Sequence, residues 1–106
     1  MPKYLWQVNY SPAGAQGLLE QGGSTRKAAI TEMVESVGGT VEAFYFAFGT
    51  DDLYVIGDVP DEVAAAALSV RTAASGGATS RTVPLLTAEQ LDAAVAKDVS
   101  YRPPGA

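Results

Sequence analysis

The sequence predicts an α+β fold in the order β-α-β-β-α-β, followed by a C-terminal helix. Three observations support this prediction: an alternating strand near the N-terminus, an aromatic hairpin in the middle, and two Gly-Gly pairs that each end a helix before a strand. Each half of the chain is then one βαβ-like unit, as a split βαβ plan requires. Short right-handed connections give one four-stranded antiparallel sheet with both main helices on one face.

The N-terminal third contains a strand and two helices. Residues 4–10 alternate aromatic or branched residues with others, which is typical of a strand. Ser11 can cap a short helix that has Pro12 in its first turn and ends near residue 20. Ser24 can cap a second helix to about residue 37, because its apolar residues recur at helical spacing.

The rest of the chain continues the pattern. Residues 41–58 form two aromatic and β-branched runs around a Gly-Thr-Asp-Asp turn, which predicts a β-hairpin. An alanine-rich helix opens at Pro60 and ends by Gly76, and residues 78–85 form a polar strand. A capping-box sequence at 87–90 opens a last helix to about residue 97.

No linker divides the 106 residues, so we expect a single domain over 1–106. The proline-rich tail, residues 101–106, cannot be helical. We expect it to lie extended on the surface or on a neighbouring subunit.

Neither strand of the hairpin alternates cleanly between apolar and polar residues, as a sheet with one face in water should. We infer that both faces of the sheet are covered. The helices of so short a chain cover only one face, so a partner subunit is needed for the other. We therefore expect a homodimer or a larger homo-oligomer, in which two sheets meet face to face.

Polar residues within the strands assign the faces. By this rule Gln7, Asn9, Thr79 and Arg81 belong to the open face. Glu42 and Asp58 are polar too, and because side chains alternate along a strand, we expect the aromatic residues two and four positions away from them to lie on the same face. The predicted pocket or interface residues are Gln7, Asn9, Glu42, Phe44, Phe46, Tyr54 and Arg81, with Phe48 and Ile56 beside them. The predicted helix-facing residues are Trp6, Val8, Val41, Ala43, Tyr45, Leu53, Val55 and Val83.

Composition excludes several classes of function. The chain has 7 basic and 12 acidic residues and a formal charge of −5, which disfavours nucleic acid or an anionic membrane surface as the main partner. It has no cysteine, which excludes thiolate nucleophiles and cysteine-based metal sites, and no histidine, which is the commonest general base and metal ligand. We expect no cofactor and no metal. With neither a signal peptide nor a membrane span in the sequence, we expect a cytoplasmic protein.

A glycine-rich loop is the best candidate for an anion site. Ser24, Thr25, Arg26 and Lys27 follow two glycines at a predicted helix start, where free backbone N–H groups attract anions. Basic residues oppose the helix dipole there, so a bound carboxylate, a phosphate or an acidic residue of another subunit would explain them. The alternative is a glycine-rich turn with two solvated basic residues.

A second cluster is acidic: Asp51, Asp52, Asp58, Asp61 and Glu62. Such a density suits a hard cation, but the spacing does not match an EF-hand loop. Aspartates also favour turns and helix starts. We therefore expect Asp51 and Asp52 to shape the hairpin turn.

Three segments resemble the GYD-domain family: KYLWQVNYSPAGAQGLLEQGGSTRKAA, VESVGGTVEAFYFAFGTDDLYVI, and RTVPLLTAEQLD with the ending SYRPPGA. The resemblance covers essentially the whole chain and implies a ferredoxin-like fold of the dimeric α/β-barrel group. The motif of the family's name is Gly-x-Tyr-Asp at the hairpin. Gly49 and Asp52 match it here, whereas Asp51 replaces the tyrosine, so no role of that tyrosine carries over.

The resemblance assigns no function, and the wider structural group includes cofactor-free monooxygenases, lactone isomerases and stress-responsive proteins. Two hypotheses therefore stand. The first is a small-molecule-binding or assembly module that uses the open sheet face, which predicts a filled interface. The second is a cofactor-independent enzyme, monooxygenase- or isomerase-like, acting on a small hydrophobic substrate between the sheets, which predicts a closed cavity with a buried ionisable group. In that enzyme Arg81 would stabilise an oxyanion.

Overall fold

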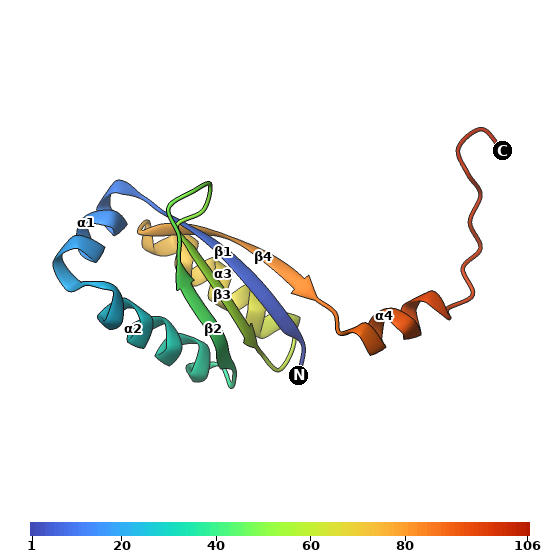
Figure 1. Cartoon of the computed structure of the whole chain (residues 1–106), viewed down its shortest axis with the longest axis horizontal. Helices are drawn as coiled ribbons and strands as arrows, with labels where there is room; N and C mark the ends of the chain where they lie inside the picture. The colour runs from blue at the N-terminus through green and yellow to red at the C-terminus, as the bar shows by residue number, and fades with distance from the viewer.

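The computed structural model describes all residues, 1–106. Its elements follow the predicted order (Figure 1): β1 (Lys3–Tyr10), α1 (Pro12–Gln21), α2 (Gly23–Ser36), β2 (Thr40–Phe46), β3 (Leu53–Asp58), α3 (Glu62–Ser75), β4 (Ala78–Leu85) and α4 (Ala88–Val95). None of these helices is long and apolar enough to cross a membrane.

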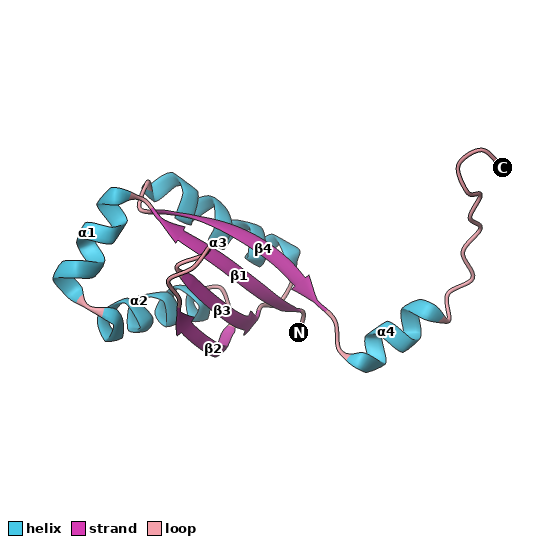
Figure 2. Ribbon diagram, turned by 45° about the horizontal axis from the view of Figure 1, so that its top comes forward, coloured by secondary structure: helices cyan, strands magenta, loops and turns pink.

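The four strands form one antiparallel sheet in the order β2-β3-β1-β4. Helices α2 and α3 pack against the same face of this sheet and leave the other face open (Figure 2). The predicted fold, a ferredoxin-like arrangement of four antiparallel strands and helices, is confirmed.

The helix ends show why most of the predicted boundaries hold. Ser11 caps α1 by accepting a hydrogen bond from the Gly14 N–H, and Thr87 forms a complete capping box with Gln90. The predicted cap at Ser24 is wrong. Helix α2 already begins at Gly23, and its N-cap is Gly22, which joins the two helices with a positive φ of 80° that glycine adopts without strain.

The core lies between the sheet and the helices α2 and α3. Strand residues Trp6, Val8, Leu53 and Val55 supply one side of it. The helices supply the other side through Ile30, Val34, Ala65 and Leu68.

The strand β2 contains a β-bulge that corrects the predicted faces. Val41 pairs with Gly57, whereas Ala43 pairs with Ile56, so Glu42 is an extra residue in the ladder. Because side chains alternate along a strand, one extra residue moves every following side chain to the opposite face. Phe44 and Phe46 therefore lie on the helix-covered face, not on the open face as predicted.

The same bulge places Ala43 and Tyr45 on the open face, opposite Ile56 and Tyr54, and not on the helix-covered face. Val83 was also predicted to face the helices, but it lies opposite Leu5 on the open face. Phe48 lies outside the strand in the hairpin loop and is fully exposed.

The C-terminal residues leave the body of the molecule after β4. Helix α4 and the extended tail project away from the sheet (Figure 1). This arm, residues 86–106, exposes the apolar side chains of Leu86, Leu91, Val95, Val99 and Tyr101.

Two glycines in α1 give a matched test of the packing between α1 and Gly77, the residue before β4. A Cβ on Gly14 would overlap the Gly77 carbonyl, which is rigid backbone, whereas a Cβ on Gly17 would meet nothing within 4 Å. We expect Gly14→Ala to lower the free energy of unfolding by about 1–3 kcal/mol through overpacking. Gly17→Ala should raise it by up to about 1 kcal/mol, because alanine favours the helix. Urea unfolding measures both, and equal effects would contradict the close approach.

Candidate functional site

A buried carboxylate lies on the open face of the sheet. The side chain of Asp51 is only 3% exposed, although its residue belongs to the hairpin loop. Its oxygens accept hydrogen bonds from Arg81 Nη2 at 2.6 Å and Asn9 Nδ2 at 2.9 Å. Tyr54 Oη and Gln7 Nε2 donate at 3.2 and 3.3 Å. We refer to these five residues as the Asp51 network.

The strand register brings the four donors together. Gln7 on β1 lies opposite Tyr54 on β3 and Arg81 on β4, and Asn9 follows two residues later on the same face. Three strands thus present donors at the end of the sheet next to the hairpin loop.

The neighbouring Asp52 holds the loop in place. Its backbone N–H donates to the Val8 carbonyl at 2.9 Å, and its carboxylate accepts from the Tyr10 N–H at 2.9 Å. Its own carbonyl accepts from the Ala47 N–H at 2.8 Å. The predicted turn-shaping role therefore falls to Asp52, and this anchoring aims Asp51 at the donors.

The network keeps the Asp51 carboxylate ionised. Burial raises its pKa, but the hydrogen bonds from Asn9, Arg81 and Tyr54 outweigh burial and leave the pKa below its ordinary value. The same hydrogen bond to Asp51, with burial, raises the pKa of the Tyr54 phenol. A carboxylate that is ionised and already accepts four hydrogen bonds is a poor general base.

An apolar row crosses the middle of the open face beside the network. Its residues lie opposite one another on the four strands: Ala43, Ile56, Leu5 and Val83. Tyr45 extends this surface on β2 and is 72% exposed. We refer to these five residues as the apolar row.

A cluster of charges lies on the other side of the apolar row. Lys3 forms ion pairs with Glu42 and, at 3.2 Å, with Asp58. Hydrogen bonds to Glu42 and then to Asp58 raise the pKa of Lys3. The open face therefore has an apolar middle between two internally paired polar ends.

The structure brings together only some of the predicted pocket residues. Gln7, Asn9, Tyr54 and Arg81 converge on Asp51, whereas Glu42 lies at the opposite end with Lys3. Phe44 and Phe46 are on the other face and pack edge to face, with ring centroids 5.2 Å apart. Asp51 was predicted to shape the hairpin turn and not to belong to the pocket. Only an indirect feature of the sequence pointed to Asp51. Polar residues at every second position of β1 and β4 lie on one face and need a hydrogen-bond acceptor there.

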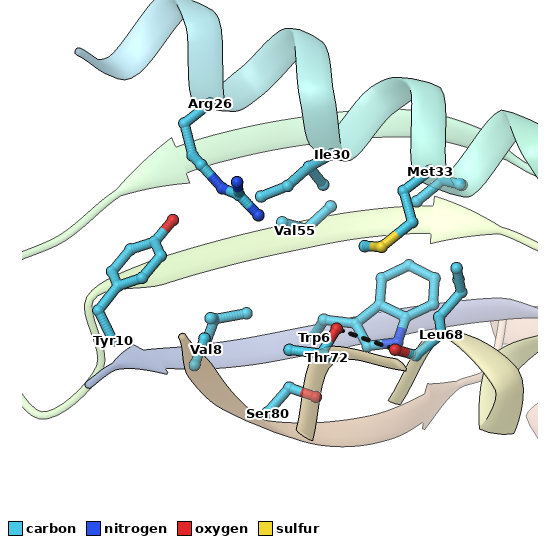
Figure 3. A pocket seen from close by; sticks show the side chains of 12 residues that line it. Trp6, Val8, Tyr10, Arg26, Ile30, Met33, Val55, Leu68, Thr72 and Ser80 are labelled. Carbon is cyan, nitrogen blue, oxygen red and sulfur yellow. Dashed lines mark hydrogen bonds between the residues drawn. The ribbon is translucent and has the colours of Figure 1, made fainter. Parts of the chain in front are cut away.

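The predicted anion loop is divided between two surfaces. Ser24 and Lys27 line a shallow depression on the outside of α2 together with Glu32 and Glu35, and Thr25 is exposed. Arg26 instead points toward the sheet, where it lines a cavity with Trp6 and Tyr10 (Figure 3).

The acidic cluster is also divided. Asp58 pairs with Lys3, and Asp61 caps α3 by accepting from the Ala64 N–H at 2.9 Å. No group of three or more metal-ligating side chains lies together in the chain.

Comparison with known proteins identifies the family. The family model described as the GYD domain matches residues 4–95 of the 106-residue chain. The chain therefore belongs to the GYD domain family. No curated protein and no solved structure matches the chain.

Removing the charge of Asp51 should destabilise the fold. In Asp51→Asn one carboxylate oxygen is replaced by an NH₂ group. At least one pair of the donors that now converge on Asp51, such as Asn9 and Arg81, then faces another donor and loses its acceptor. We expect a clear loss in the free energy of unfolding, measured by urea denaturation. The exposed Asp98→Asn, which changes the same charge, should have no such effect. Equal stabilities of the two variants would contradict a structural role for the network.

The lowered pKa of Asp51 also predicts how stability depends on pH. A carboxyl whose pKa is lower in the folded than in the unfolded chain stabilises the fold fully above its unfolded pKa, about 3.9. This contribution is lost as the pH falls through the folded pKa. The stability difference between the wild type and Asp51→Asn should therefore be largest near neutral pH and shrink in acid. A constant difference down to pH about 2 would contradict this assignment.

Proposed function

We propose that this GYD-domain protein is an assembly module that forms a homodimer through the open face of its sheet. The observation that carries the proposal is the apolar row, which no helix of the chain covers (Figure 2). Tyr45 is exposed and the other four residues of the row are half-buried in the single chain, and uncovered apolar patches often mark interaction surfaces.

The energetics support association. Covering a few hundred Å² of apolar surface at about 25 cal/mol per Å² contributes several kcal/mol before the costs of association. In a two-fold dimer the same surface is used twice, so each residue of the apolar row counts in both subunits.

The polar ends of the face support specificity more than affinity. The carboxylates of Asp51, Asp58 and Glu42 all have cationic partners within the chain, so covering the face leaves no unpaired acid from these groups. The Arg81 side chain stays 60% exposed and is free to contact a facing subunit. Fixed charges at both ends of an apolar strip restrict the relative position of two such faces.

The C-terminal arm supports the same conclusion. It starts at the end of β4, an edge strand of the sheet, and projects away with Leu91 and Val95 exposed. A second copy of the chain on the open face would offer this arm a surface to cover.

The enzyme hypothesis receives less support. None of the four pockets of the single chain is lined by the Asp51 network or by the apolar row. The buried ionisable group that the hypothesis requires is present, but Asp51 is already saturated with donors. The geometry therefore favours a filled interface, and a small ligand carried on this face would appear as extra mass on the dimer.

Native mass spectrometry and analytical ultracentrifugation of gently purified protein test the interface. We expect a dimer, or a multiple of it, at micromolar concentration. Tyr45→Glu should raise its dissociation constant by more than about a hundredfold, because a dimer buries two unpaired charges. Tyr45 is exposed in the single chain, so the fold should survive.

The control is Val63→Glu, which places the same charge at an exposed position on α3, away from the open face. It should leave the dimer unchanged. A monomeric wild type would overturn the proposal, and a dimer disrupted by Val63→Glu but not by Tyr45→Glu would move the interface elsewhere. The variant Arg81→Ala separates ligand from interface: loss of a bound mass without loss of the dimer would favour a small-molecule site.

A further inference from the structure

We propose that a cavity between the sheet and the helices α2 and α3 binds a small molecule with a flat apolar body and a carboxylate head group, held by Arg26. This cavity is on the opposite side of the sheet from the apolar row and the Asp51 network. It is therefore a second site, independent of the assembly proposed above.

The cavity has apolar walls and a polar entrance (Figure 3). Its inner part, about 50 Å³, lies against Trp6, Val8, Ile30 and Val55. It continues into a wider depression of about 370 Å³, because Tyr10, Arg26, Met33, Thr72 and Ala78 line both. Apolar walls with a few polar groups are typical of small-ligand sites.

The small residues of α3 and β4 leave this space open. Thr72 on α3 and Ala78 and Ser80 on β4 stand where large aliphatic side chains would fill the layer between helix and sheet. The hydroxyl of Thr72 is directed to its own helix by a hydrogen bond to the Leu68 carbonyl at 2.9 Å.

Three buried polar atoms at the cavity have no hydrogen-bond partner within the chain: Trp6 Nε1, Tyr10 Oη and Arg26 Nε. Trp6 is only 6% exposed, so its indole N–H is well separated from solvent. Buried polar groups are nearly always paired in folded proteins, and an unpaired one is costly. The Tyr10 hydroxyl lies beside the Arg26 guanidinium, which partly offsets the rise that burial causes in the pKa of Tyr10. Trp6 Nε1 and Arg26 Nε are donors only, so an occupant with acceptor oxygens would satisfy them.

The charges around the cavity favour an anion. Arg26 makes no ion pair in the chain, and Arg71 lines the outer depression. No aspartate or glutamate lines either part, although acidic residues outnumber basic ones in the chain by 12 to 7. A guanidinium matches the two oxygens of a carboxylate, which it binds through paired hydrogen bonds.

Tyr10 completes the head-group site. Its hydroxyl points toward the Arg26 guanidinium (Figure 3). Burial raises the pKa of Tyr10 more than the nearby guanidinium lowers it, so the phenol stays neutral and can donate a hydrogen bond. The apolar inner part beyond these two residues, about 50 Å³, would take one edge of the ligand's flat body, and the rest of the body would lie in the wider depression of about 370 Å³.

Phenylacetate tests the proposal, with benzyl alcohol as the neutral analogue and acetate as the head group alone. Trp6 is the single tryptophan of the chain and lines the cavity, so its fluorescence and its indole N–H resonance report binding there. We expect saturable binding of phenylacetate with a shift of the Trp6 N–H resonance. Benzyl alcohol and acetate should each bind at least tenfold more weakly.

A matched pair of variants tests Arg26. Arg26→Gln should weaken phenylacetate binding by tenfold or more, since a charge-assisted hydrogen bond is lost. The adjacent Lys27→Gln, which removes the same charge from the outer side of α2, should leave binding unchanged. A second variant, Ala78→Leu, fills the junction of the two parts and should abolish binding even if Arg26→Gln proves unstable.

Absence of phenylacetate binding at millimolar concentration would overturn the proposal. So would equal binding by Arg26→Gln and Lys27→Gln, or equal binding of benzyl alcohol. Tyr45 lies on the other face of the sheet, so the Tyr45→Glu variant should bind phenylacetate as the wild type does. Binding at this site would therefore stand even if the wild type proves to be a monomer.

Discussion

The buried carboxylate of Asp51 is the interaction on which the open face depends. A single negative charge from the hairpin loop is held by side chains of β1, β3 and β4, so it ties the loop to three of the four strands. Desolvating a carboxylate is costly unless it is paired and hydrogen-bonded. The two adjacent aspartates therefore have different roles. Asp52 binds the backbone of β1, and this contact positions Asp51 so that its carboxylate faces its donors.

The bulge at Glu42 connects this face with the opposite one. By shifting the alternation of β2, it leaves Tyr45 on the open face and places Phe46 against the start of α2, where a Cβ on Gly23 would lie 3.0 Å from the Phe46 ring. Arg26 lies one turn further along α2 and points toward the sheet (Figure 3). One extra residue in β2 thus sets which of its side chains lie on the surface proposed for assembly and which pack toward α2.

Local signals in the sequence were sufficient for the order of the elements and most of their ends. Capping residues such as Ser11 and Thr87 act within one turn, so they can be recognised without knowing the fold. The sequence could not predict which side chains of β2 lie on which face. A bulge is defined by the pairing with another strand and leaves no residue pattern in the sequence of the bulged strand itself. The role of Asp51 was hidden for the same reason: its four partners lie between 3 and 44 residues away along the chain.

The detached C-terminal arm has a consequence for the rate of folding. A helix of eight residues is only marginally stable in water without tertiary contacts, even with the capping box at Thr87. In the proposed dimer, the body of the chain would fold in a first-order reaction, whereas the arm would gain lasting order only on contact with the second subunit. Refolding of the proposed dimer would then have a late phase whose rate rises with protein concentration, and α4 would be the last helix to become protected from hydrogen exchange.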